Sequence, residues 1–252
     1  MTILDRDGVA IHYDAEGQGL PVLLTHGYAA TGRMWKPQVE AFKDRCRFIT
    51  WDLRGHGESG SPDDPSLYSH DLSVEDMCAI LDAENIDQAV IGGHSLGGFL
   101  SLRFNVSHPE RVKALYLQGC GPGYRKAEGR EAWNETARKR AERFEELGLE
   151  ALSGASEVRR DQHHSPTGLA HAARGILSQQ DAQVIDSLPH IGVPTLIAVG
   201  EDDRAFLGSS DYMAAKIPGA AKFVIEGAGH GCNLDRPERV NEILGEFLSA
   251  IA

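Results

Sequence analysis

The sequence has few cysteines, no long apolar run and fewer basic than acidic residues, and each shortage argues against a class of protein. The 4 cysteines among 252 residues are scattered and lack the spacing of metal ligands, so we expect no cysteine-bound metal. No apolar run approaches the roughly 20 residues of a transmembrane helix, and residues 1–8 contain no apolar stretch of signal-peptide length. We therefore expect a cytoplasmic protein with no membrane attachment. A formal net charge of −12 argues against nucleic acid as a partner, because phosphates attract clustered Lys and Arg.

Length and composition are those of an ordinary globular protein. A chain of 252 residues suits one domain with a modest insertion, and 41% apolar with 25% charged residues argues against disorder. Short apolar runs alternate with helical patterns, which predicts an α/β fold with a mostly parallel central sheet flanked by helices. An opening hairpin over residues 3–13 supplies the first two predicted strands, and the next six are residues 22–25, 47–51, 89–93, 112–117, 195–199 and 222–225.

Residues 121–188 differ from the rest of the chain in composition and in the spacing of their apolar residues. They are strongly charged, follow helical spacing and lack a convincing strand. We interpret them as a helical lid inserted after the sixth core strand. The core itself is then formed by two segments, residues 1–120 and 189–252.

The first helix of this lid has one apolar face. Gly148 is expected to end the helix, because glycine readily adopts the backbone conformation that follows a helix. The apolar face carries Trp133, Ala137, Ala141, Phe144 and Leu147. Trp133 and Phe144 are candidate substrate contacts, although the regular spacing favours packing within the lid.

The strongest chemical motif is Gly93-His94-Ser95-Leu96-Gly97, which matches G-x-S-x-G. The pattern alone is common, but here a buried strand leads into it and a helix leads out, as at the sharp turn that exposes a nucleophilic serine. We expect Ser95 to have a strained backbone, with Gly93 and Gly97 leaving room for the neighbouring chain. The alternative, that Ser95 only caps a helix, requires the flanking pattern to be coincidental.

A serine hydroxyl needs a base, and histidine accepts a proton readily near neutral pH. Among the 11 histidines, His230 is the candidate because it follows a strand and small residues surround it. His94 adjoins the serine, so its side chain is expected to point into packing. His163 and His164 are expected to be polar surface of the lid.

The carboxylate that orients the histidine should also follow a strand. Residues 200–203 come directly after the strand at 195–199 and offer Asp202 and Asp203, whereas no carboxylate follows the strand that ends at Leu117. Either aspartate gives the chain order serine, acid, histidine, which differs from the orders of two common serine-protease folds.

An oxyanion formed by attack on a carbonyl needs two preorganised N–H donors. One is expected from the backbone of Leu96, which follows the nucleophile. The other is expected from the backbone of Tyr28, in the loop after the strand at 22–25. Gly27, beside Tyr28, is a candidate neighbour of the substrate.

Together these motifs resemble the α/β-hydrolase superfamily over essentially the whole chain. The resemblance implies a lid between the sixth and seventh core strands, and an acid three residues after Gly200, which is Asp203. Within the superfamily the chain looks most like small bacterial serine esterases and enol-lactonases. Ser95 argues against epoxide hydrolases and haloalkane dehalogenases, which carry aspartate at that position. The matching stretches are residues 26–28, 52–59, 93–98, 108–112, 200–203 and 229–230.

These residues predict a serine hydrolase that cleaves a small carboxylic ester or lactone through an acyl-enzyme, with Ser95 as nucleophile, His230 as base and Asp203 as its orienting acid. The expected partner is a small-molecule substrate, no metal or organic cofactor is expected, and no particular oligomeric state is indicated. Three alternatives use the same fold: a C–C bond hydrolase of a ring-cleavage pathway, a perhydrolase, and a ligand-binding protein without catalysis. Gly231 argues against the first, because such hydrolases often have tryptophan after the histidine.

Overall fold

The computed structural model describes residues 2–152 and 154–252, and in this part of the chain eight strands form one sheet. The strand order is β1-β2-β4-β3-β5-β6-β7-β8. β2 pairs antiparallel with β1 and with β4, and every pair from β4 through to β8 is parallel. The predicted α/β fold and its opening hairpin are therefore confirmed. The strands are β1 (Thr2–Arg6), β2 (Val9–Gly17), β3 (Leu20–Thr25), β4 (Cys46–Trp51), β5 (Ala89–His94), β6 (Val112–Gln118), β7 (Thr195–Gly200) and β8 (Ala221–Ile225).

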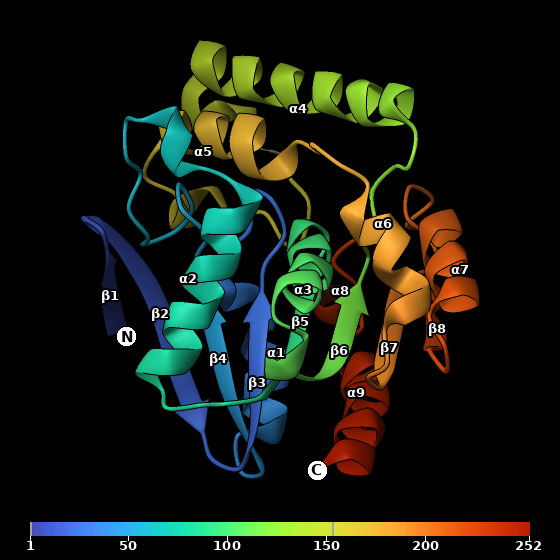
Figure 1. Cartoon of the computed structure of the whole chain (residues 1–252). Helices are drawn as coiled ribbons and strands as arrows, with labels where there is room; N and C mark the ends of the chain where they lie inside the picture. Colours follow the sequence, from blue (N-terminus) through green and yellow to red (C-terminus); the bar gives the residue numbers. More distant parts are fainter. Residues whose placement is uncertain (1, 153) are drawn as a thin grey trace.

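Helices cover both faces of the sheet and divide the core into two layers. Along β3, Leu23 packs into one layer while Val22 and Leu24 pack into the other, because alternate side chains of a strand point to opposite faces. Figure 1 shows α2 and α3 on one face and α1 and α9 on the other. The helices are α1 (Lys36–Phe42), α2 (His70–Ala83), α3 (Leu96–Ser107), α4 (Ala127–Leu147), α5 (Pro166–Ala172), α6 (Gln183–Ser187), α7 (Leu207–Lys216), α8 (Cys232–Asp235) and α9 (Pro237–Ile251).

The segment between β6 and β7 is helical wherever it has regular structure in the described residues. It contains α4, α5, α6 and a π-helical turn at Ala173–Leu177 that continues α5. Figure 1 shows α4 lying across the end of the molecule toward which the parallel strands point, with α5 beneath it. That residues 121–188 form a lid separate from a core of residues 1–120 and 189–252 remains a prediction from the sequence.

Helix α4 agrees with its sequence pattern except at its last residue. Ala137, Ala141 and Phe144 are buried, and Gly148 ends the helix with a φ of 58°. Leu147, which was expected on the same face, is 48% exposed, so that part of the prediction is wrong. The helix ends at Leu147, but its buried apolar face ends one turn earlier, at Phe144.

The expectation that His163 is polar surface is also wrong. Its side chain is buried, and its Nε2 donates to the Ala29 carbonyl oxygen at 2.9 Å. Burial lowers the pKa of His163 below its ordinary value, so the ring is neutral at neutral pH. His163 thus links the lid segment to the loop after β3, whereas its neighbour His164 is exposed as expected.

No helix among the described residues is both long enough and apolar enough to cross a lipid bilayer.

Candidate active site

The turn between β5 and α3 gives Ser95 the strained backbone that the sequence predicts. Its φ of 54° and ψ of −113° lie in a region that residues with side chains rarely adopt. A Cβ atom at Gly93 would lie 2.3 Å from the carbonyl carbon of Gly97, and one at Gly97 would lie 2.1 Å from the Thr25 carbonyl oxygen. Only glycine fits at these two positions. The Ser95 N–H donates to the Gln118 carbonyl at 2.8 Å, which ties the turn to β6.

His230 and Asp203 are joined by a short hydrogen bond. Nδ1 of His230 lies 2.8 Å from Oδ2 of Asp203, and because an ionised carboxylate only accepts, the imidazole donates through Nδ1. That assignment leaves Nε2 as the basic nitrogen of the ring. The Asp203 side chain is 5% exposed, whereas Asp202 is an exposed residue of the same loop. Phe206 stacks on the imidazole, with ring centroids 4.9 Å apart and planes inclined by 20°.

His94 supports His230 from the other side. Its ring centroid lies 4.4 Å from that of His230, and its Nε2 donates to the His230 carbonyl oxygen at 3.0 Å. Burial lowers the pKa of His94 well below its ordinary range, so the ring stays neutral beside the candidate base. Gly27 belongs to this contact rather than to the cavity wall. A Cβ atom there would lie 2.5 Å from Nδ1 of His94 and 3.2 Å from Cβ of Ser95.

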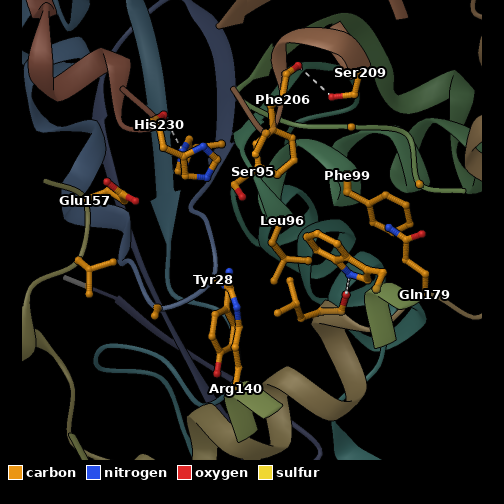
Figure 2. A pocket seen from close by; sticks show the side chains of 18 of the residues that line it. Tyr28, Ser95, Leu96, Phe99, Arg140, Glu157, Gln179, Phe206, Ser209 and His230 are labelled. Carbon is orange, nitrogen blue, oxygen red and sulfur yellow. Dashed lines mark hydrogen bonds between the residues drawn. The ribbon is translucent and has the colours of Figure 1, made fainter. Parts of the chain in front are cut away.

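Ser95 and His230 line the same cavity, and Figure 2 shows the serine and the imidazole on adjoining parts of its wall. The Ser95 hydroxyl makes no hydrogen bond to His230 or to any other residue that the structure describes. Contacts between a nucleophile and its base are commonly long in ligand-free sites and tighten when substrate binds. The fold thus gathers Ser95, Asp203 and His230 at the ends of β5, β7 and β8.

Two backbone N–H groups beside Ser95 have no acceptor among the described residues. Leu96 is the first residue of α3, so its N–H has no partner within the helix. The Tyr28 N–H is likewise unpaired in the loop after β3. The Tyr28 ring is buried, and its hydroxyl donates to the Leu169 carbonyl of α5 at 2.8 Å. This hydrogen bond holds the Tyr28 side chain against α5.

The cavity has a volume of about 590 Å³ and is lined by residues of α4 and of the loops that follow the parallel strands. Trp133 and Phe144 both line it, as the sequence suggested, and both also pack within the helical segment. The Trp133 indole donates to the Leu177 carbonyl at 2.8 Å, and the Phe144 ring meets the edge of Tyr28 at 6.2 Å. Sequence reasoning missed three charged residues that line the same cavity: Arg140, Arg143 and Glu157.

A family model described as "Alpha/beta hydrolase family" matches residues 22–243. The chain belongs to the alpha/beta hydrolase family. It is similar to a solved thermophilic esterase from Thermogutta terrifontis, with a TM-score of 0.83, 29% identity, and coverage of 99% of this chain and 97% of that one. It is 28% identical to 3-oxoadipate enol-lactonase 1 of Acinetobacter baylyi, over 99% of this chain and 97% of the relative. It is also 28% identical to 2-hydroxymuconate semialdehyde hydrolase of Pseudomonas sp. strain CF600, over 96% and 91% of the two chains.

A buried charged pair in this alpha/beta hydrolase holds the Tyr28 loop against the loop after β4. Oδ2 of Asp52 lies 3.1 Å from Nδ1 of His12 and accepts the Glu58 N–H, while Oδ1 accepts the Gly32 N–H at 2.8 Å. Burial opposes ionisation of Asp52, but these donors outweigh it and lower its pKa from 3.8 to about 2. The hydrogen bond to Asp52 raises the pKa of His12 above 6.5, against the effect of burial.

We expect His12 to stabilise the fold most at mildly acidic pH. The folded protein holds the His12 proton more tightly than the unfolded chain, so this contribution is complete below pH 6.5 and is lost as the pH rises through the raised folded pKa. Urea unfolding of the wild type and of His12→Gln across this range checks it. The difference in free energy of unfolding should shrink by about 1 kcal/mol or more as the pH rises. A difference that grows with pH would contradict the assignment, and His190→Gln, at an exposed position, serves as control.

Proposed function

We propose that this protein hydrolyses a small carboxylic ester or lactone through an acyl-enzyme formed on Ser95. The observation that carries the proposal is the 2.8 Å hydrogen bond between Asp203 and His230, placed on the same cavity as Ser95. A carboxylate bound at Nδ1 holds the imidazole in the tautomer whose Nε2 can accept the serine proton. The strained turn presents the hydroxyl to this cavity, and the free N–H groups of Tyr28 and Leu96 flank it.

The reaction follows from these positions. Oγ of Ser95 attacks the substrate carbonyl while Nε2 of His230 takes the hydroxyl proton. The N–H groups of Tyr28 and Leu96 stabilise the oxyanion, and each such donor typically contributes about 2.7–4 kcal/mol in the transition state. The imidazolium then protonates the leaving alkoxide, which leaves an acyl-enzyme. His230 next activates water, which attacks the acyl carbonyl, and returns the proton to Ser95 as the acid departs.

The relatives and the cavity both support an ester or lactone substrate. An esterase and an enol-lactonase align with nearly the whole chain. The cavity is lined by apolar and aromatic side chains near Ser95, among them Leu96, Phe99 and Phe206, which suits a small, partly apolar substrate.

Carbon–carbon bond hydrolysis is the second candidate, because a semialdehyde hydrolase also aligns over most of the chain. The position after His230 argues against it. A Cβ atom at Gly231 would lie 2.7 Å from Oγ of Ser156 and 2.9 Å from Oε2 of Glu157. The side chains of Ser156 and Glu157 would therefore have to move to admit the tryptophan that many such hydrolases have at this position.

Covalent labelling tests the proposal directly. A fluorophosphonate probe reacts quickly only with an activated serine, so we expect complete labelling of the wild type within minutes and none of Ser95→Ala. Mass spectrometry of the labelled peptide should place the adduct on Ser95, and hydrolysis of 4-nitrophenyl acetate should disappear in step with labelling. A folded wild type that neither labels nor turns over esters would favour a ligand-binding protein without catalysis.

A further inference from the structure

Arg140 interrupts the inward-facing side of α4. Residues 133, 137, 140 and 144 are spaced three and four apart, so they lie along one side of the helix. Trp133 and Phe144 line the cavity from this side, and Ala137 is buried on it. Arg140 also lines the cavity, with its guanidinium carbon 5.9 Å from the centroid of the Tyr28 ring. Figure 2 shows the side chain extending along Tyr28. A cation is thus placed where the helical pattern calls for an apolar residue.

Arg143 adds a second positive charge to the same wall. It lies one turn after Arg140 on α4 and also lines the cavity. Both side chains are exposed, so a ligand in the cavity can reach them. Two arginines three residues apart can together bind one carboxylate, since each guanidinium offers a fork of donors that matches its two oxygens.

Neither arginine contacts a carboxylate or a backbone carbonyl among the described residues, which distinguishes them from the other arginines of the helical segment. Those others each contact a carboxylate or a backbone carbonyl: Arg125, Arg130, Arg138, Arg159, Arg160 and Arg174. In a chain with a formal net charge of −12, acidic residues are plentiful. The two unpaired guanidinium groups are the two that face the cavity.

Glu157 is the one carboxylate that lines the cavity in the described part of the chain. It is 8% exposed, and its Oε2 accepts from Oγ of Ser156 and lies over Gly231, next to His230. It forms no ion pair with either arginine. Figure 2 shows Glu157 beside His230 and Arg140 beside Tyr28, at separate parts of the cavity. The cavity therefore has an acidic side chain near His230 and basic side chains near Tyr28 and α4.

We propose that the substrate is an ester or lactone that also carries a free carboxylate, and that Arg140 and Arg143 bind this carboxylate while Ser95 attacks the ester carbonyl. This inference rests on the proposed function and names its substrate class. The acid group points toward α4, away from Glu157, and the scissile carbonyl lies at the N–H groups of Tyr28 and Leu96.

Two matched pairs of esters test the inference on either half of the substrate. Mono-4-nitrophenyl adipate is compared with 4-nitrophenyl 6-methylheptanoate, in which an isopropyl group replaces the carboxylate. 4-Carboxyphenyl butyrate is compared with 4-acetylphenyl butyrate, which places the charge on the leaving group instead. For each pair the preference is the ratio of kcat/KM for the acidic ester to that for the neutral ester.

The wild type should prefer the acidic member of at least one pair. In the double variant Arg140→Met, Arg143→Met this preference should fall about tenfold, mainly through a higher KM for the acidic ester, as expected for loss of a solvent-accessible bidentate contact. Arg140→Lys should keep part of the preference. Arg138→Met is the matched control, because Arg138 lies on the same helix and pairs with Glu131 and Glu135 at the surface, and it should keep the wild-type preference.

A wild type that hydrolyses the neutral esters without preferring an acidic one would overturn the inference and leave the proposed function intact. A preference that survives in the double variant would also overturn it. A wild type that hydrolyses none of the four esters and takes no fluorophosphonate label would overturn the proposed function and this inference with it.

Discussion

Replacing Ser95 with alanine is expected to abolish ester hydrolysis, with kcat falling by about 10⁴-fold or more. The variant keeps His230, Asp203 and the two free N–H groups, so any residual rate comes from substrate binding and oxyanion stabilisation alone. Initial rates with 4-nitrophenyl acetate at neutral pH, corrected for spontaneous hydrolysis, measure the loss. The fold should persist, because alanine removes only the hydroxyl, which has no hydrogen-bond partner among the described residues.

The matched control for this substitution is Ser107→Ala. Ser107 is the last residue of α3, the helix that Ser95 precedes, and its side chain is exposed. It should hydrolyse the ester at the wild-type rate. Retention of near wild-type activity by a correctly folded Ser95→Ala protein would exclude the acyl-enzyme on this residue.

Replacing Asp203 with asparagine is expected to lower kcat by about 10⁴-fold while leaving the fold intact. The carboxylate accepts the proton on Nδ1 of His230 at 2.8 Å. An asparagine amide can donate to that nitrogen instead, which would stabilise the tautomer that carries its proton on Nε2. The imidazole would then be unable to take the proton of Ser95. Steady-state kinetics across neutral pH should show the loss in kcat.

Asp202→Asn separates this effect from a general change of loop charge. Asp202 lies beside Asp203 but is exposed, and it makes no side-chain hydrogen bond in the described structure. This variant should stay within about twofold of the wild type, since exposed charges contribute little. A large loss in Asp202→Asn with a small loss in Asp203→Asn would reverse the assignment of the orienting acid.

The sequence predicted those features that backbone geometry forces. Gly93 and Gly97 were expected to leave room at the turn, and each would place a Cβ atom within 2.3 Å of another residue's backbone. The strand pattern likewise predicts the α/β fold. Parallel strands are buried on both faces, so each one is a short apolar run in the sequence, whichever helices pack on it. The candidate residues Ser95 and His230 follow strands whose ends meet at one edge of the sheet.

The helical segment was harder to predict, because its side chains are placed by contacts between elements distant in sequence. Histidine is common on surfaces, yet His163 is buried against the Ala29 carbonyl. The sequence does not mark Arg140 as a cavity residue, because a charged residue on a charged helix is ordinarily solvated, although its position among Trp133, Ala137 and Phe144 is a usable signal. Spacing alone predicts Leu147 on the packed face, but spacing does not show where the partner helix stops.

The surroundings of His230 limit what its ring can do during the proposed reaction. Asp203 accepts a hydrogen bond from Nδ1, and Phe206 stacks on one face of the imidazole ring. His94 donates a hydrogen bond to the backbone carbonyl of His230. A half-turn of the ring would break the first contact, so the imidazole cannot exchange its two nitrogens between steps without losing its anchor. One atom, Nε2, must therefore shuttle every proton of the cycle, from serine to departing alcohol and from water back to serine.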